Sequence, residues 1–473
     1  MRKQNKKFLV IFFILAGISG WVSSQSLYEI KRATFSTPVA DDYAPVFFRN
    51  GLLFTSNRRS SALVTYESTE GIPTSNIYFV QRKDSMSWGV ARLLDKSLAT
   101  LFNEGPACFD SVHNILYFTR NLNTDRKNKT QVNNYGIFTA QLQNNVWTNV
   151  KPFPFNNPAY KTGHPALTLS GDTLFFVSDQ PGGKGKADIY ITILEQGKWT
   201  EPENLGSEVN SDSSELFPFW HPSGRLYFAS NRPGTMGGLD IYYTRNINGK
   251  WLNPMQLKAP FNSVADDFGF IADKTFTYGL LTSSREGRDN IFTFNSMIPV
   301  NPGCKAMEAP VNCFMFYETQ SRGIDTIPVI YQWDFGDGKQ AFGHTSEHCY
   351  DNPGTYLARL NVTDTITGEV RHDVATYLVE VVKVEQAVIE APDSCMAGEP
   401  VKISGGVEIS GFIPAQYLWN FGDGEVMEGN PVEKTYYDPG IHRIQLSVIS
   451  EPGDQKKIQQ TCITKNIKVL LNK

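Results

Sequence analysis

Few residues of this 473-residue chain have types and spacings that could carry out chemistry. The seven histidines are scattered, and His164 and His221 are the two that fall at or near corresponding places of a repeated unit. Two imidazoles brought together could hold a divalent metal or exchange protons with a substrate. The chain contains no HExxH motif, phosphate-binding glycine loop, dinucleotide-binding glycine pattern or GxSxG motif. We therefore predict no catalytic residues, no metal and no cofactor.

The composition is that of an exported, strand-rich chain. Aromatic residues make up 12%, and there are 38 Gly and 26 Pro, a mixture typical of short strands joined by tight turns. The formal net charge of −4 disfavours a nucleic-acid binder, which normally presents a basic surface. Residues 1–24 combine a basic start, a short apolar stretch and small residues. This pattern predicts a signal peptide cleaved after Ser24, with an uncleaved membrane anchor as the alternative.

One sequence unit recurs five times between residues 25 and 298. Each unit opens with a segment around a central Pro or Gly, continues with an apolar strand and a polar turn, and usually closes near a Trp. The openings lie at 43–45, 104–106, 163–165, 217–219 and 268–270, and the closing residues are Trp88, Trp147, Trp199 and Trp251. Four short strands per unit of about fifty residues indicate the blade of a β-propeller. We expect five blades, with six blades or a sandwich of unrelated hairpins as alternatives.

The two ends of the repeat complement each other. The fifth unit has its third strand at 290–294 but no Trp-bearing segment after it, whereas residues 28–38 resemble the closing segments of the other units. We therefore predict that the N-terminal strand completes the last blade and closes the ring. Closure would remove the free strand edges that an open array exposes.

Charged residues recur with the repeat. Acidic segments at 41–42, 212–215 and 266–267 precede three units. We interpret them as caps of strand ends or as an acidic rim that recruits a basic partner. Arginines follow the second strand in four units, and we place them on the opposite rim in a structural role. They are Arg58, Arg120, Arg232 and Arg285.

Two turn segments carry a family resemblance. Residues 178–190 and 230–242 both run from Ser through Pro and several Gly to Asp-Ile-Tyr, and they resemble the blade signature of TolB-like, WD-related periplasmic propellers. The glycines allow positive φ angles in the turn, and the aspartates are suited to accept hydrogen bonds from turn amides. We assign structural roles to Asp188, Tyr190, Asp240 and Tyr242.

The last third of the chain carries a second resemblance. Trp333-Asp-Phe-Gly-Asp-Gly and Trp419-Asn-Phe-Gly-Asp-Gly are each followed by Tyr and then Pro-Gly, which closely resembles PKD (polycystic-kidney-disease) domains. The resemblance implies two immunoglobulin-like β-sandwiches, at 299–386 and 387–473. Each Trp should pack between the sheets, and Asp-Gly should form a tight turn. The residues assigned to this structural motif are Trp333, Asp337, Gly338, Trp419, Asp423 and Gly424; calcium binding by the two aspartates is the less favoured alternative.

Five of the six cysteines lie in the predicted sandwiches. No pair has the short spacing of a zinc or redox site, and export permits disulfides. In the second sandwich Cys395 lies near the first strand and Cys462 near the last. Because these strands are neighbours in the implied fold, we expect a Cys395–Cys462 disulfide. For the first sandwich, Cys313–Cys349 and Cys304–Cys313 both remain possible.

The expected architecture is all-β, a five-bladed β-propeller at 25–298 followed by two immunoglobulin-like sandwiches. It predicts a non-enzymatic scaffold that binds envelope proteins and no nucleic acid, in the periplasm or peripheral to the outer membrane. The resemblances imply Bacteroidetes envelope proteins, some of which accompany type IX secretion and gliding machinery. The alternatives are a carbohydrate-binding or polysaccharide-lyase-like propeller, with a glycan as ligand, and an adhesin on the cell surface.

Overall fold

The computed structural model describes residues 27–58, 74–84, 87–123, 133–247, 249–297, 303–308, 312–317, 328–423, 425–437, 439–452 and 458–470. Within these ranges every regular element is a β-strand, and no helix is long and apolar enough to cross a membrane. The predicted signal peptide at 1–24 and Gly424 lie outside the described residues.

The described residues between 28 and 296 form five antiparallel sheets, numbered here along the chain. Sheet 1 consists of β2 (Asp42–Phe48), β3 (Gly51–Ser56), β4 (Asn76–Gln81) and β5 (Arg92–Leu93). Sheet 2 consists of β6 (Glu104–Asp110), β7 (Ile115–Asn121), β8 (Tyr135–Gln143) and β9 (Val146–Pro152). Sheet 3 consists of β10 (Thr162–Leu167), β11 (Thr173–Ser178), β12 (Asp188–Glu195), β13 (Lys198–Trp199) and β14 (Glu203–Asn204).

The remaining two sheets follow the same plan. Sheet 4 consists of β15 (Glu215–His221), β16 (Arg225–Ser230), β17 (Asp240–Ile247), β18 (Lys250–Trp251) and β19 (Met255–Gln256). Sheet 5 consists of β20 (Asp267–Ala272), β21 (Tyr278–Ser283), β22 (Asn290–Ser296) and the N-terminal strand β1 (Tyr28–Arg32). The pairing of β1 with β22, which sets Ile30 opposite Phe294, confirms the predicted role of the N-terminal strand in the last sheet.

Apolar clusters join each sheet to the next. Five clusters each draw their residues from two consecutive sheets, and one of them joins sheet 5 to sheet 1 through Leu52, Phe54, Leu280 and Ile291. The first strands β2, β6, β10, β15 and β20 also contact one another in that order, and β20 contacts β2. The second strands are covered on both faces, which explains their near-continuous apolar sequences.

The last third forms two sandwiches with the same strand plan. The first contains a sheet of β26 (Gln340–Phe342), β25 (Val329–Asp334), β28 (Gly354–Asp364) and β29 (Val370–Val381), with β24 (Cys313–Tyr317) and β27 (Thr345–Cys349) opposite. The second contains β30 (Ala387–Glu390), β32 (Pro400–Val407) and β35 (Val432–Thr435), facing β33 (Pro414–Asn420), β34 (Val426–Glu428), β36 (Gly440–Ser450) and β37 (Gln460–Leu470). Short strands β31 (Ser394–Met396) and β23 (Lys305–Ala306) pair with β37.

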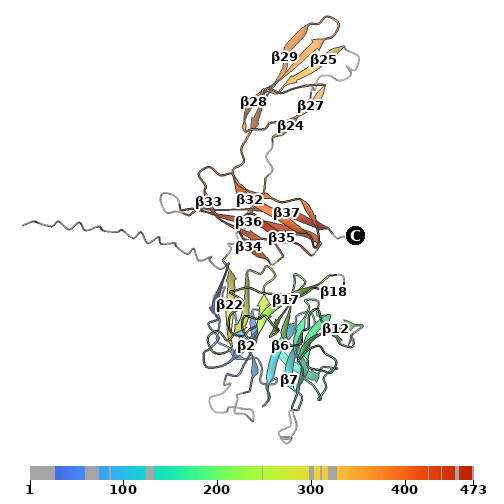
Figure 1. The fold of residues 1–473 in the computed structure, drawn as a ribbon, viewed down its shortest axis with the longest axis vertical. Coiled ribbons are helices and arrows are strands. Elements are labelled where there is room, and N and C mark those ends of the chain that lie inside the picture. Colours follow the sequence, from blue (N-terminus) through green and yellow to red (C-terminus); the bar gives the residue numbers. More distant parts are fainter. Residues whose placement is uncertain are drawn as a thin grey trace, which may run out of the picture.

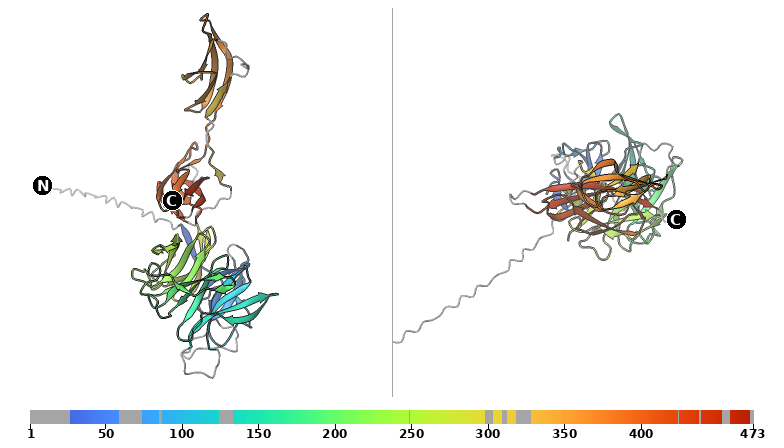
Figure 2. Two further views of the ribbon diagram at one scale, coloured as in Figure 1. Left: turned by 90° about the vertical axis from the view of Figure 1, so that its right-hand side faces the viewer. Right: turned by 90° about the horizontal axis from the view of Figure 1, so that it is seen from above.

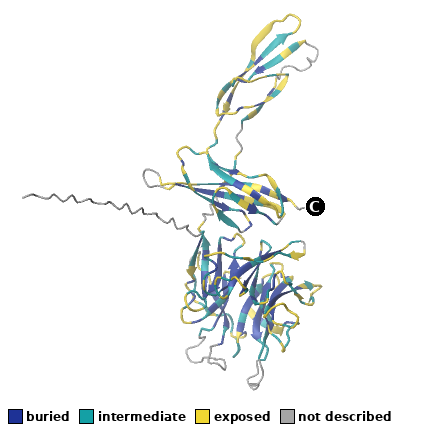
Figure 3. Cartoon of the chain, viewed as in Figure 1, coloured by how far each residue is buried: buried dark blue, intermediate teal, exposed yellow. Residues whose placement is uncertain are grey.

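The order of the parts in space differs from their order in the chain. The second sandwich lies between the five sheets and the first sandwich, which is therefore the distal part of the molecule (Figures 1 and 2). Buried residues fill the five sheets, whereas the distal sandwich is mostly exposed or intermediate (Figure 3). The chain consequently passes the second sandwich before it enters the distal one.

This path corrects the predicted disulfide. Cys462 is bonded to Cys304, with their Cα atoms 5.3 Å apart, and Cys395 is a free thiol. Cys395 does lie beside the last strand, as expected, but its register partner there is Val469. Seven residues of extended strand, about 23 Å, separate that position from Cys462. The segment at 304–306, assigned from the sequence to the first sandwich, pairs instead with the second, where Lys305 lies opposite Ile463.

Candidate functional sites

The first strand of every sheet bends at or beside the centre of its opening segment. The bent residues have φ angles between 50° and 98°, and the strand register shifts around each of them. They are Ala44, Gly105, His164, Phe217 and Gly269. Such bulges change the direction of the strand and of the side chains beside it. The bends of the five strands line one central cavity.

The central cavity is small and apolar. Its volume is about 180 Å³, and its walls are mainly proline, alanine, branched aliphatic and aromatic side chains. Drug-sized ligand pockets span roughly 300–1,000 Å³ and combine apolar walls with several polar groups. His164 and Cys108 are the titratable side chains of the lining, so the cavity offers little hydrogen bonding to a sugar.

His164 is held in its neutral form. Its Nδ1 accepts a hydrogen bond from the backbone N–H of Phe217 at 3.3 Å, and the two rings stack with centroids 4.2 Å apart. Burial lowers the pKa of His164 to about 4. The backbone N–H of His164 donates to Thr119 Oγ1 at 3.0 Å, which fixes the bend of β10.

His221 does not join His164 in a site. Its ring is fully buried, with Nε2 donating to the carbonyl of Asp273 at 2.8 Å and Nδ1 accepting from the backbone N–H of Ser223 at 3.1 Å. Both ring nitrogens are thus used to fix a turn. Among the described residues, no three His, Cys, Asp or Glu side chains are grouped so that they could hold a metal ion.

Buried carboxylates at the start of the sheets pair with the recurrent arginines. The pairs are Asp42–Arg58 at 2.7 Å, Glu215–Arg232 at 3.0 Å and Asp267–Arg285 at 2.6 Å. The prediction that acids and arginines lie on opposite rims is therefore wrong. Antiparallel pairing puts the beginning of the first strand beside the end of the second, as Asp42 lies opposite Ser56. These carboxylates are consumed inside the fold and do not form an acidic rim.

Glu104 is the corresponding carboxylate of sheet 2, and it is less well satisfied. Its Oε1 accepts a hydrogen bond from the backbone N–H of Thr100 at 3.1 Å and lies 3.4 Å from Arg120 Nε. Its buried Oε2 has no hydrogen-bond partner among the described residues. Burial raises the pKa of Glu104 to about 7, against the opposing effects of Thr100 and Arg120.

The residues of the blade-like signature stabilise turns and cores. Asp188 and Asp240 accept hydrogen bonds from backbone N–H groups of the preceding turn, at 2.9 Å and 2.6 Å. Tyr190 and Tyr242 are buried and stack on a phenylalanine of the neighbouring strand. Each carboxylate also accepts a hydrogen bond from a side-chain amide, Asn204 for Asp188 and Gln256 for Asp240.

The PKD-like motif of the distal sandwich forms a closed turn. Trp333 is fully buried, and its Nε1 donates to the carbonyl of Gly343 at 3.1 Å. Gly338 has a φ of 89°, which a side chain would strain. Asp337 lies 2.8 Å from His348 Nε2 and accepts the backbone N–H two residues further on at 3.0 Å.

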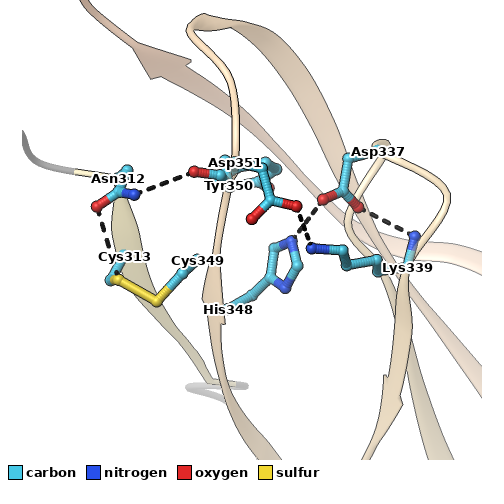
Figure 4. Close-up of a disulfide and its surroundings, with 8 residues drawn as sticks. All are labelled: Asn312, Cys313, Asp337, Lys339, His348, Cys349, Tyr350 and Asp351. Carbon is cyan, nitrogen blue, oxygen red and sulfur yellow. Dashed lines mark hydrogen bonds and ion pairs between the residues drawn. A yellow bond between two sulfur atoms is a disulfide. The ribbon is translucent and has the colours of Figure 1, made fainter.

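A disulfide lies next to this turn. Figure 4 shows His348 projecting from β27 toward Asp337, with the adjacent Cys349 bonded to Cys313. These cysteines are register partners in β24 and β27, so Cys313–Cys349 is the one of the two alternatives that forms. The Asp337 carboxylate is thus occupied by donors from its own turn and from His348.

The second sandwich repeats this geometry with a charged group in place of the imidazole. Trp419 is fully buried and donates to the carbonyl of Gly429 at 2.8 Å. Lys434 occupies the position of His348, eleven residues after the motif aspartate in both cases. Its Nζ lies 2.7 Å from Asp423 and 2.6 Å from Glu425.

The same carboxylates contact the five sheets, and we call this contact the joint. Arg225 of β16 is buried, with Nη2 lying 3.7 Å from Asp423 and 3.5 Å from Glu425. Val426 packs on the apolar cluster shared by sheets 4 and 5. Burial alone would raise the pKa of Asp423, but the charges of Lys434 and Arg225 hold it below its ordinary value.

The sequence did not point to Arg225. It stands at the first position of a second strand, where β3 has Gly51 and β11 has Thr173. A charged side chain at this buried position is the available signal, because a buried cation requires an anionic partner. Nothing in the local pattern shows that the partner belongs to another domain.

The PKD domain family model matches residues 303–379 and 384–465, the part of the chain that forms the two sandwiches, in agreement with the sequence resemblance. Among solved structures, the fibronectin(III)-like modules of Clostridium thermocellum CbhA are 13% identical, covering 36% of this chain and 93% of that chain at a TM-score of 0.14. An ulvan lyase from a new polysaccharide lyase family is 9% identical, with 90% and 94% covered and a TM-score of 0.24. Escherichia coli alpha-2-macroglobulin is 9% identical, with 91% and 44% covered at 0.14. Likenesses this weak define neither fold nor function.

Proposed function

We propose that the chain is a non-enzymatic protein-interaction scaffold of a bacterial cell envelope. The five sheets act as its base in the form of a five-bladed, TolB-like propeller. The cyclic series of apolar clusters and the contact of β20 with β2 support this architecture. The signal-peptide pattern at 1–24 supports export to the periplasm or to the periplasmic side of the outer membrane.

The observation that carries the proposal is the fastening of the second sandwich. On one side Arg225 of the base meets Asp423 and Glu425, and on the other Cys304 ties the incoming chain to Cys462. These two connections hold the second sandwich on the base, so the distal sandwich lies away from the base and is accessible to a partner. We infer that the distal sandwich is the main contact for a partner protein.

The use of polar side chains supports a binding role over catalysis. His221, the repeated aspartates and the repeated arginines all satisfy groups within the fold. The central cavity has a neutral His164 and otherwise mainly apolar walls. A lyase would need a proton acceptor and a charge-stabilising group arranged around a sugar carboxylate.

Chemical cross-linking in cells of the source organism, followed by purification of the tagged full chain, tests this function. We expect one envelope protein to co-purify in a roughly constant ratio, and we expect the purified chain to leave a panel of polysaccharides uncleaved. Turnover that disappears in His164→Ala or His221→Ala would instead make the chain an enzyme. The absence of any stoichiometric partner would also contradict the scaffold.

A further inference from the structure

Strand β29 gives the distal sandwich an open edge. It is 12 residues long and is the last strand in the order β26-β25-β28-β29. Within the described residues it pairs with β28 alone. The edge of a sheet presents backbone N–H and C=O groups that can pair with another extended chain.

The corresponding edge of the second sandwich is covered. Ala375 of β29 pairs with Leu360, as Ile463 of β37 pairs with Leu446, so β29 and β37 are equivalent strands. On its other side β37 pairs in parallel with β23 and with β31. The chain itself thus shows which occupant this edge accepts, namely a short extended segment that runs parallel to the last strand.

The covered edge also identifies the backbone groups that β29 leaves open. The carbonyl of Thr464 accepts a hydrogen bond from Met307, and the N–H of Lys468 donates to Asp393, each at 2.9 Å. Along the shared register these positions correspond to Thr376 and Glu380. Because backbone groups on a strand alternate in direction, Leu378 between them faces the same edge.

A bulge and an ion pair protect the first part of β29 against unwanted pairing. Asp373 has a φ of 54°, lies beside a register shift and is 3.7 Å from Arg359. Bulges and charges of this kind discourage edge-to-edge pairing. The next residues, 374–378, read Val-Ala-Thr-Tyr-Leu and contain no charge.

Apolar side chains on both faces of this stretch are partly or largely exposed. Tyr377 faces the core, with its ring centroid 6.1 Å from that of Trp333, yet it is 40% exposed. On the opposite face Leu378 is 74% exposed, and its cross-strand neighbour Leu357 is 39% exposed. An added strand with alternating apolar side chains would remove apolar surface from water on both faces.

We propose that the edge of β29 between residues 374 and 381 binds an extended segment of a partner protein by β-sheet addition. The segment runs parallel to β29, hydrogen-bonds to Thr376, Leu378 and Glu380, and places apolar side chains against Tyr377 and Leu378. This inference rests on the proposed scaffold function and specifies its contact. In this mode of recognition the main-chain bonds provide affinity and alternate side chains provide specificity.

Amide exchange and a selected peptide test the proposal on the full chain. The N–H groups of Thr376 and Leu378 should exchange rapidly in the free protein, whereas slow exchange there would mean that the edge is already covered. Random dodecapeptides displayed on phage are then selected on the immobilised chain, and a fluorescent copy of the enriched peptide is titrated. We expect an alternating apolar consensus that protects both amides.

Substitutions at the edge separate this site from others. Leu378→Pro removes an N–H that the pairing with β28 does not use, and Leu378→Lys adds a charge without altering the backbone. Losing one edge hydrogen bond and the adjacent apolar contact should weaken peptide binding about tenfold or more. Ile366→Lys, at an exposed turn of the same sandwich, is the matched control and should leave binding unchanged. Equal binding by all three variants would overturn the proposal.

Failure of this inference can be told from failure of the scaffold. If the full chain captures a cross-linked partner and both Leu378 variants capture it equally, the scaffold stands and the β29 site is wrong. If the chain captures nothing and turns over a substrate, the scaffold itself fails. Self-association that Leu378→Lys abolishes would identify a second copy as the occupant and would also overturn the proposal.

Discussion

The buried carboxylates at the start of four sheets differ in how many hydrogen bonds they accept, and this number affects the cost of burying their charge. Glu215 accepts bonds from Ser211, Ser230 and Arg232. Glu104 of sheet 2 keeps one buried oxygen without a partner among the described residues. An ionised carboxylate that lacks a donor is costly to bury, which is why the pKa of Glu104 rises to about 7.

The substitution Glu104→Gln should change how the stability of the protein depends on pH. Because the folded-state pKa of Glu104 lies above the unfolded value, its contribution to stability is present below about pH 4.5 and is lost as pH rises through 7. The stability of Glu104→Gln relative to wild type should therefore increase between pH 5 and 8, by at most about 3 kcal/mol, on top of a cost for leaving Arg120 beside a neutral amide. Urea unfolding at a series of pH values measures this difference. The exposed control Glu203→Gln should show no such trend, and a parallel pH dependence for Glu104→Gln and wild type would refute the assignment.

At the scale of elements, the repeat made the five sheets predictable because each unit places strands and turns in the same order. The place of β1 in the last sheet followed from a segment that is missing at one end of the repeat and present at the other. The pairing of β23 with β37 did not follow, because two residues, Lys305 and Ala306, form too short a strand for any periodicity. The wrong Cys395 pairing has the same origin, since its correct replacement depends on where β23 lies.

The Cys304–Cys462 disulfide allows a direct check of that path. Six cysteines with two disulfides leave two free thiols, Cys108 and Cys395, so titration of the unreduced, denatured protein should find two. Cys304→Ser should lower the free energy of unfolding of the second sandwich by about 2–4 kcal/mol, the usual contribution of a disulfide. It should also speed amide exchange at 305–307.

Cys395→Ser is the control, and it should change neither the stability nor the exchange rates. If Cys395→Ser instead removed a disulfide, the Cys395–Cys462 pairing expected from the sequence would be correct.

At the scale of the whole molecule, the joint and the disulfide decide which surface faces a partner. The sequence contained both PKD motifs and Arg225, but it could not show that the C-terminal sandwich stands between the base and the N-terminal one. That order comes from contacts between distant residues, such as Arg225 with Asp423, and such contacts leave no local pattern. Removing one member of a buried ionic group leaves the other charges uncompensated and costs roughly 3–5 kcal/mol, so the joint requires all of its charges.

The most direct test of the account is photo-cross-linking in cells from chosen positions of the full chain. A photoreactive phenylalanine analogue would replace Leu378 or Phe342 on the distal sandwich, and Leu169 or Val264 on the base, all of which are exposed. We expect a single protein partner to be captured from the distal positions, most strongly from 378, and little from the base. Capture from the base alone, or no capture from any position, would contradict a scaffold that presents its distal sandwich.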